Sequence, residues 1–153
     1  MKSKSKELII NRNIKNIYGF LILTNSNVLI GTISKNKKEI NYENKVDFRK
    51  IRTRGGASAL RFAGVLRERI ARSVRLIDDN LENIFIKENE LNISGLIIAG
   101  NMDAINKYLS SKFHKDYLNK YISSKIETDY GGEWGFRIIN DKLLINNFKT
   151  IYD

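Results

Sequence analysis

One apolar stripe constrains the fold of this chain more than any other feature. Hydrophobic side chains recur every three or four residues through the middle of the sequence, which places them on one face of an α-helix. The stripe consists of Ala59, Phe62, Ala63, Leu66, Ile70, Val74, Ile77, Leu81 and Ile84. A helix of this extent is roughly 40 Å long at about 1.5 Å per residue. We therefore expect one long helix that covers a sheet.

Individual residues refine the predicted helix. Ser58 directly precedes the stripe and is expected to act as its N-cap, because a hydroxyl can accept a hydrogen bond from a free N–H at the helix start. Gly64 weakens the helix by about 1 kcal/mol relative to alanine, so we expect fraying or bending there. Glu68 and Arg72 are spaced for an ion pair on the polar side.

Short β-type segments lie on both sides of the helix. Residues 17–24 and 28–33 flank a turn-forming Asn-Ser-Asn sequence, which predicts a hairpin, and residues 39–46 predict a third strand. Residues 91–99 form an apolar run that predicts a buried central strand, ended by Gly100.

The remaining segments complete the prediction. We expect a helix at 102–109, one or two helical turns at 113–118, a strand at 121–128 and a closing helix at 134–148. This order predicts a mixed α/β fold with a central mixed β-sheet flanked by helices.

The composition limits the class of protein. The net charge is +10, so we expect salt-dependent binding to polyanions, although an excess of lysine from codon bias alone would give the same charge. The chain contains no cysteine and one histidine, His114, which excludes disulfides, thiolate metal sites and multi-histidine sites. No apolar run approaches the roughly 20 residues of a membrane span, and no secretory leader is recognisable. We expect a cytoplasmic protein without cofactor or metal.

A basic diglycine segment precedes the helix. Residues 47–57 lack an apolar period, which predicts a loop, and Gly55 and Gly56 let the backbone approach another molecule closely. The run from Arg54 to Phe62, R-G-G-A-S-A-L-R-F, resembles the signature G-R-G-G-Q-S-A-L-R-F of the middle domain of eukaryotic and archaeal class-one peptide chain release factors. This chain has Thr53 in place of the first glycine and Ala57 in place of the glutamine.

Two further blocks carry the same resemblance. Residues 92–100, N-I-S-G-L-I-I-A-G, resemble the family segment N-V-A-G-L-V-L-A-G, and residues 129–136, D-Y-G-G-E-W-G-F, resemble S-Y-G-G-E-N-G-F. The three blocks follow the family's order with compatible spacing. The resemblance implies a ribonuclease-H-like layout for a release-factor middle-like domain at 17–153, preceded by a basic N-terminal tail at 1–16.

The resemblance also implies a site. Gly55, Gly56 and Ala57 would enter the ribosomal peptidyl transferase centre beside the ester that joins peptide to tRNA. Alanine keeps the backbone N–H but has no side-chain amide, and loss of one oxyanion-type donor costs roughly 10² to 10³ in rate. Ala57 therefore predicts weak or absent hydrolysis, and whether the chain is an enzyme stays open.

The expected partners are the ribosome, with the RNA of its peptidyl transferase centre, and peptidyl-tRNA. RNA phosphates are expected to meet the basic residues around the loop, because arginine's planar fork suits phosphate oxygens. These residues are Arg49, Lys50, Arg52, Arg54 and Arg61. No membrane is expected, and no GTPase either, because the family domain that recruits one has no counterpart here.

Other interpretations stay open. The chain could be the middle domain of a release factor, a catalytically silent stand-alone paralogue that occupies ribosomes in rescue or dormancy, or a plain rRNA-binding module. Pelota-type surveillance proteins fit less well because they lack the diglycine loop. His114 is expected on a helix surface, and Asp129 and Glu133 in a strand-to-helix turn rather than as a catalytic carboxylate pair.

Overall fold

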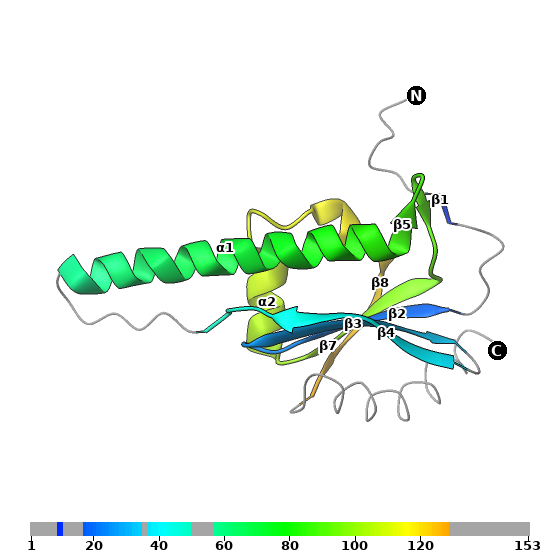
Figure 1. Cartoon of the computed structure of the whole chain (residues 1–153), viewed down its shortest axis with the longest axis horizontal. Coiled ribbons are helices and arrows are strands. Elements are labelled where there is room, and N and C mark those ends of the chain that lie inside the picture. The colour runs from blue at the N-terminus through cyan, green and yellow to red at the C-terminus, as the bar shows by residue number, and fades with distance from the viewer. Residues whose placement is uncertain (1–8, 11–16, 35–36, 50–56, 129–153) are drawn as a thin grey trace.

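A five-stranded sheet lies beneath one long helix in the computed structural model (Figure 1). The structure describes residues 9–10, 17–34, 37–49 and 57–128, with the backbone alone for residues 9, 10, 37, 57–63 and 66. The predicted closing helix at 134–148 and the predicted turn with Asp129 and Glu133 lie outside the described residues.

The main sheet has the order β4-β3-β2-β7-β8. Its strands are β2 (Tyr18–Leu23), β3 (Asn27–Ser34), β4 (Lys37–Lys45), β7 (Gly95–Gly100) and β8 (Ile122–Glu127). The pairs β2–β3 and β3–β4 are antiparallel, whereas β2–β7 and β7–β8 are parallel. The predicted mixed α/β fold is therefore confirmed.

The predicted hairpin between β2 and β3 is confirmed, and its turn is closed locally. The N–H groups of Ser26 and Asn27 donate to Thr24 Oγ1 at 3.3 and 2.9 Å. All six residues of β2 and all six of β7 are buried, which is the pattern of strands covered on both faces.

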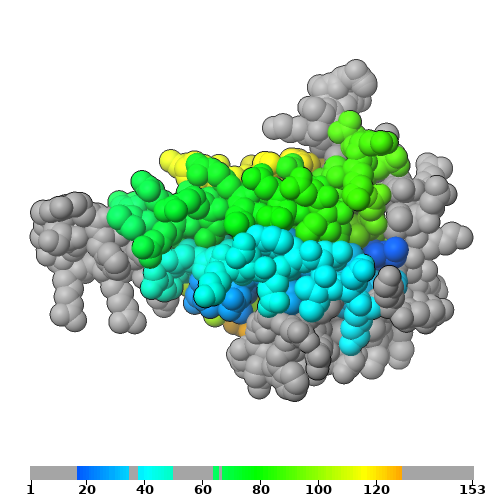
Figure 2. All heavy atoms as spheres, viewed as in Figure 1, coloured from blue at the N-terminus to red at the C-terminus, as the bar shows by residue number. Residues whose placement is uncertain are grey.

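The long helix α1 (Ala57–Phe85, 29 residues) confirms the helix that the apolar stripe predicted. In its C-terminal half Val74, Ile77 and Leu81 are buried in one cluster with Leu21 and Ile98 of the sheet. Burying a side chain of this size contributes about 1.5–3 kcal/mol, so the stripe fixes α1 to the sheet. In Figure 2 the green atoms of α1 lie directly along the cyan atoms of β4. The N-terminal half extends beyond the sheet (Figure 1).

One expectation about α1 is wrong. The helix already begins at Ala57, so Ser58 lies inside it and is not the N-cap. The helix continues through Gly64 without a break. A Cβ at Gly64 would meet nothing within 4 Å.

The predicted strand at 91–99 is split in two. Its first residue belongs to a small hairpin of β5 (Ile86–Lys87) and β6 (Glu90–Leu91), and β7 begins only at Gly95. Glu88 and Asn89 close that hairpin with positive φ of 54° and 65°. The strand β1 (Ile9–Ile10), within the segment expected as a tail, pairs with β6 in parallel.

After β7 the chain crosses back over the same face as α1. Helix α2 (Met102–Ser110) is capped by Asn101, whose Oδ1 accepts from the Ala104 N–H at 3.0 Å. A 3₁₀ helix, η2 (Asp116–Tyr121), replaces the turns predicted at 113–118 and leads into β8. Buried side chains of α2 and η2 share the cluster with α1. This crossover brings residues 111–115 against the middle of α1.

Candidate nucleic-acid interface

The structure gives only a partial view of the site expected from the sequence. Ala57 is the first residue of α1, and Arg61 follows one turn later with only its backbone described. The other expected site residues, Gly55, Gly56, Lys50, Arg52 and Arg54, lie outside the described residues. Their roles stay predictions.

Arg49 is the one expected RNA-binding side chain that the structure describes. Its Nε and Nη2 donate to the two carboxylate oxygens of Asp47 at 2.9 and 2.8 Å. The hydrogen bond from Arg49 is the main reason why the pKa of Asp47 lies below its usual value. A phosphate would have to compete with Asp47 for this guanidinium.

Asp47 and Phe48 fix the segment that leads toward the glycine loop. The Asp47 N–H donates to Ser73 Oγ of α1 at 2.9 Å, and the Phe48 carbonyl accepts from Lys107 Nζ of α2 at 2.9 Å. The Phe48 ring is completely buried. The segment before residue 50 is therefore tied to both helices.

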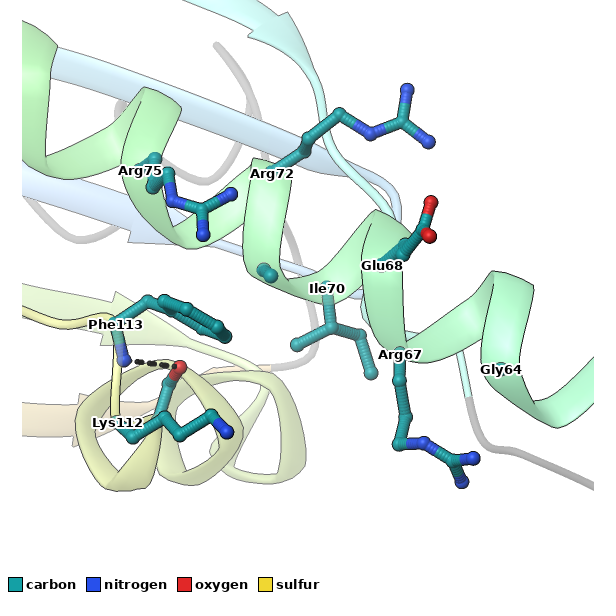
Figure 3. Close-up of a pocket in the computed structure, with 10 residues that line it drawn as sticks. Gly64, Arg67, Glu68, Ile70, Arg72, Arg75, Lys112 and Phe113 are labelled. Atoms are coloured by element: carbon teal, nitrogen blue, oxygen red, sulfur yellow. Dashed lines mark hydrogen bonds between the residues drawn. The ribbon is translucent and has the colours of Figure 1, made fainter.

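A groove of about 590 Å³ runs between α1 and the segment that follows α2 (Figure 3). Four cationic side chains line it against one carboxylate, that of Glu68. The cations are Arg67, Arg72, Arg75 and Lys112. Figure 3 shows Ile70 between Arg67 on one side and Phe113 on the other, whereas Glu68 and Arg72 point away from Phe113.

The cations of the groove are available to a ligand. Among the residues that the structure describes, none of the four makes an ion pair. The predicted Glu68–Arg72 pair is therefore wrong: both side chains extend into solvent, where a surface pair contributes little against its loss of side-chain entropy.

Phe113 is the aromatic residue of the groove, and this residue is 38% exposed. The guanidinium carbon of Arg75 lies over the ring at 4.3 Å from its centroid, and Lys112 Nζ lies at 5.3 Å. These distances fit cation–π contacts. The ring and the guanidinium together offer two flat groups at the edge of the groove.

A buried polar cluster holds the segment that carries Phe113. The carboxylate of Asp78 on α1 is fully buried and accepts from Tyr108 Oη at 2.6 Å, from His114 Nδ1 at 3.1 Å and from the Lys115 N–H at 2.8 Å. On its other side His114 Nε2 contacts Asn119 Oδ1 at 2.7 Å. This cluster connects α1, α2 and η2.

His114 is therefore not the surface residue expected from the sequence, because its side chain is 1% exposed. Burial lowers the pKa of His114, but the hydrogen bonds to Asp78 and Asn119 outweigh it and the pKa is raised. With Asn119 in this orientation both ring nitrogens face acceptors, which is the pattern of a protonated imidazolium. Its role is structural.

Glu82 reinforces the same connection one turn further along α1. Its carboxylate accepts from Lys115 Nζ and from Tyr117 Oη. Burial, followed by the hydrogen bond to Glu82, raises the pKa of Tyr117, so its hydroxyl stays a donor near neutral pH. Asp78 and Glu82, one helical turn apart, thus both bind the crossover.

The described residues contain no group of side chains that could hold a metal ion, and none of their helices is long and apolar enough to cross a membrane. Within the described residues, the groove combines one exposed aromatic ring with four cationic side chains that make no ion pair. Sequence reasoning missed Lys112 and Phe113. The sequence contains one indication of the α1 side of the groove. Arg67 and Arg75 are eight residues apart, which places them about two turns apart on one face of a helix.

Comparison with known proteins decides the family. The model of the family described as eRF1 domain 2 matches residues 17–146. The chain belongs to the eRF1 domain 2 family. All three blocks of the sequence resemblance lie within this range.

Two relatives of this eRF1 domain 2 chain are eukaryotic peptide chain release factor subunit 1 proteins. The protein from Caenorhabditis elegans is 34% identical over 121 residues, which are 79% of this chain and 20% of the relative. The protein from Blepharisma americanum is 34% identical over 119 residues, which are 78% of this chain and 27% of the relative. The chain thus spans about a fifth to a quarter of these relatives.

Solved structures share the fold. The archaeal translation termination factor aRF1 matches with a TM-score of 0.53 and 16% identity, over 77% of this chain and 31% of that one. Pelota from Archaeoglobus fulgidus matches with a TM-score of 0.55 and 16% identity, over 87% of this chain and 33% of that one. At this identity the two structures support the fold alone.

Proposed function

We propose that this eRF1 domain 2 chain acts in translation termination by presenting its diglycine loop to the ribosomal peptidyl transferase centre. The observation that carries the proposal is the family match over residues 17–146. The partners would be ribosomal RNA and peptidyl-tRNA, in the cytoplasm. We expect no GTPase contact from this domain and no cofactor.

The geometry of α1 supports the proposal. The helix begins at Ala57, immediately after Gly56, and its N-terminal half extends beyond the sheet (Figure 1). A helix N-terminus carries free N–H groups and a partial positive charge. Such a terminus favours charge that develops on an ester oxygen during hydrolysis.

We infer that hydrolysis is weak or absent in this chain. Ala57 can donate its backbone N–H but has no amide to orient a water or to donate a second hydrogen bond. The loss of one such donor is worth roughly 10² to 10³ in rate. The change leaves the helix and the sheet untouched, so ribosome affinity should remain.

Ala57 also supports a second candidate function, that of a catalytically silent paralogue which occupies the ribosome in rescue or dormancy. The two functions differ in the effect of the chain on peptide release. A termination factor gains release activity once the amide is restored, both alone and in combination with the other domains. A paralogue selected for occupancy binds ribosomes and blocks release by an active factor.

The test restores the amide and compares it with an alkyl side chain of similar size. Ala57→Gln and Ala57→Leu would be added to ribosomes that carry labelled peptidyl-tRNA, and both occupancy and liberated peptide would be measured. We expect Ala57→Gln to release peptide roughly 10² to 10³ times faster than the parent, and Ala57→Leu to give no gain. Equal release by all three proteins at full occupancy, or no occupancy at all, would contradict the proposal.

A further inference from the structure

We propose that the groove between α1 and residues 111–113 binds an unpaired nucleotide of single-stranded RNA. The base would lie against the flat pair formed by Phe113 and Arg75, and Arg67 and Lys112 would hold the adjoining phosphates. None of the residues that line the groove belongs to the glycine loop, and the inference does not depend on the proposed role at the peptidyl transferase centre.

The exposure of Phe113 is the first observation. The ring is absent from both apolar clusters of the described residues and remains 38% exposed. Stacking of a base on a water-exposed aromatic ring makes the free energy of binding more favourable. Proteins that bind single strands use this contact for any base sequence.

The backbone that carries the ring is held in place by hydrogen bonds. The Phe113 N–H donates to Ser111 Oγ at 3.1 Å, and the His114 N–H donates to the Ser111 carbonyl at 3.1 Å. The next N–H, that of Lys115, is fixed by the buried carboxylate of Asp78 at 2.8 Å. The binding surface is thus organised before a ligand arrives, which lowers the entropy cost of binding.

Arg75 adds a second flat surface, which is stacked on one face of the ring. Its guanidinium lies over Phe113 at 4.3 Å, and guanidinium planes stack on unpaired bases as aromatic rings do. Figure 3 shows Arg67 and Lys112 reaching outward on opposite sides of Ile70. A chain of phosphates can therefore pass on either side of the seated base.

Charge and size favour RNA over an acidic peptide. Within the described part of the chain the groove cations are unpaired, and the groove volume of about 590 Å³ lies in the range of small-ligand sites. An acidic peptide would use the cations and leave the Phe113–Arg75 pair without a partner. A nucleotide uses both the charge and the flat surface.

The test measures binding of fluorescein-labelled oligoadenylate to the full chain by fluorescence anisotropy, without ribosomes. We expect Phe113→Leu to weaken binding of the single strand about tenfold, because the ring is lost and the apolar volume is kept. Phe113→Trp should bind as the parent does. Ile40→Leu, at a comparably exposed apolar residue of β4 (41%), is the matched control and should have no effect.

Further variants separate stacking from charge. Lys112→Gln should reduce the slope of log affinity against log salt concentration by the contribution of about one phosphate contact. Lys87→Gln on β5 should leave that slope unchanged. Phe113→Leu should leave the affinity for duplex RNA and for polyphosphate unchanged. The inference is overturned if Phe113→Leu binds oligoadenylate as tightly as the parent, or loses as much affinity for polyphosphate as for RNA. Because ribosomes are absent, this outcome is independent of the test with Ala57→Gln.

Discussion

A single buried carboxylate, that of Asp78, joins three elements of the structure. It accepts hydrogen bonds from Tyr108 of α2, from His114 and from the Lys115 N–H ahead of η2. Burial, followed by the charge of Asp78, raises the pKa of Tyr108 well above its ordinary value, so the phenol remains a neutral donor. Removal of the carboxylate would leave three buried donors without an acceptor.

We therefore expect Asp78→Ala to lower the free energy of unfolding by about 3–5 kcal/mol, the usual cost of breaking a buried pair on one side. Asp79 offers a matched control, since it pairs with Lys115 at 3.2 Å but is 62% exposed. Asp79→Ala should cost less than about 1 kcal/mol. Urea unfolding measures both. Equal losses for the two variants would show that Asp78 contributes no more than a surface contact.

His114 should make stability depend on pH. Because the pKa of His114 is raised in the folded protein above the ordinary value of 6.5, the folded chain holds the proton more tightly than the unfolded chain. This contribution is complete below pH 6.5 and is lost as the pH rises through the raised folded value. The free energy of unfolding, measured in urea from pH 6 upward, should fall with pH, and His114→Gln should flatten that fall. If the free energy of unfolding of His114→Gln fell with pH as steeply as that of the parent, the prediction would be wrong.

At the scale of single residues, sequence reasoning failed to predict the burial of His114, whereas the roles expected for the Arg-Gly-Gly run stay predictions. The sequence around His114, S-K-F-H-K-D, is polar, and its burial depends on Asp78, which lies 36 residues away. No local pattern encodes such a contact, so the surface assignment failed.

The element scale offers a test at Gly64, inside α1. A Cβ there meets nothing within 4 Å, and the helix is unbroken. Gly64→Ala should therefore raise the free energy of unfolding by about 1 kcal/mol.

The control is Gly100, which ends β7. It has φ of +129°, and a Cβ there would lie 2.0 Å from the Leu23 carbonyl oxygen. Gly100→Ala should destabilise the fold, and thermal melts of both variants would measure the difference. Destabilisation by Gly64→Ala would mean that the N-terminal half of α1 needs the flexibility of glycine.

Sequence periodicity predicted the long elements and missed the short ones. The stripe predicted α1 because it recurs over seven turns, and alternation with turn residues predicted β2 and β3. The β5–β6 hairpin has two residues in each strand, too few for any period. Its Asn89, with φ of 65°, was the one available signal. The groove could not be predicted, because it forms only where residues 111–113 meet α1.

For the whole molecule, the net charge of +10 should favour association with ribosomes, and the basic residues around the glycine loop should contribute most. Changing Arg52, Arg54 and Arg61 together to Glu should weaken ribosome binding and reduce its salt dependence by about three phosphate contacts. Sedimentation with ribosomes over a series of salt concentrations measures this. Lys38, Lys87 and Lys125, changed to Glu together, give the same net charge on other elements. Equal effects of the two sets would show that charge acts without a defined binding site.

The long helix packs on the sheet along its C-terminal half, whereas its N-terminal half extends beyond the sheet. Substitutions at its first residue, Ala57, should therefore leave the free energy of unfolding almost unchanged. We expect such substitutions to alter what the glycine loop does without altering whether the domain folds.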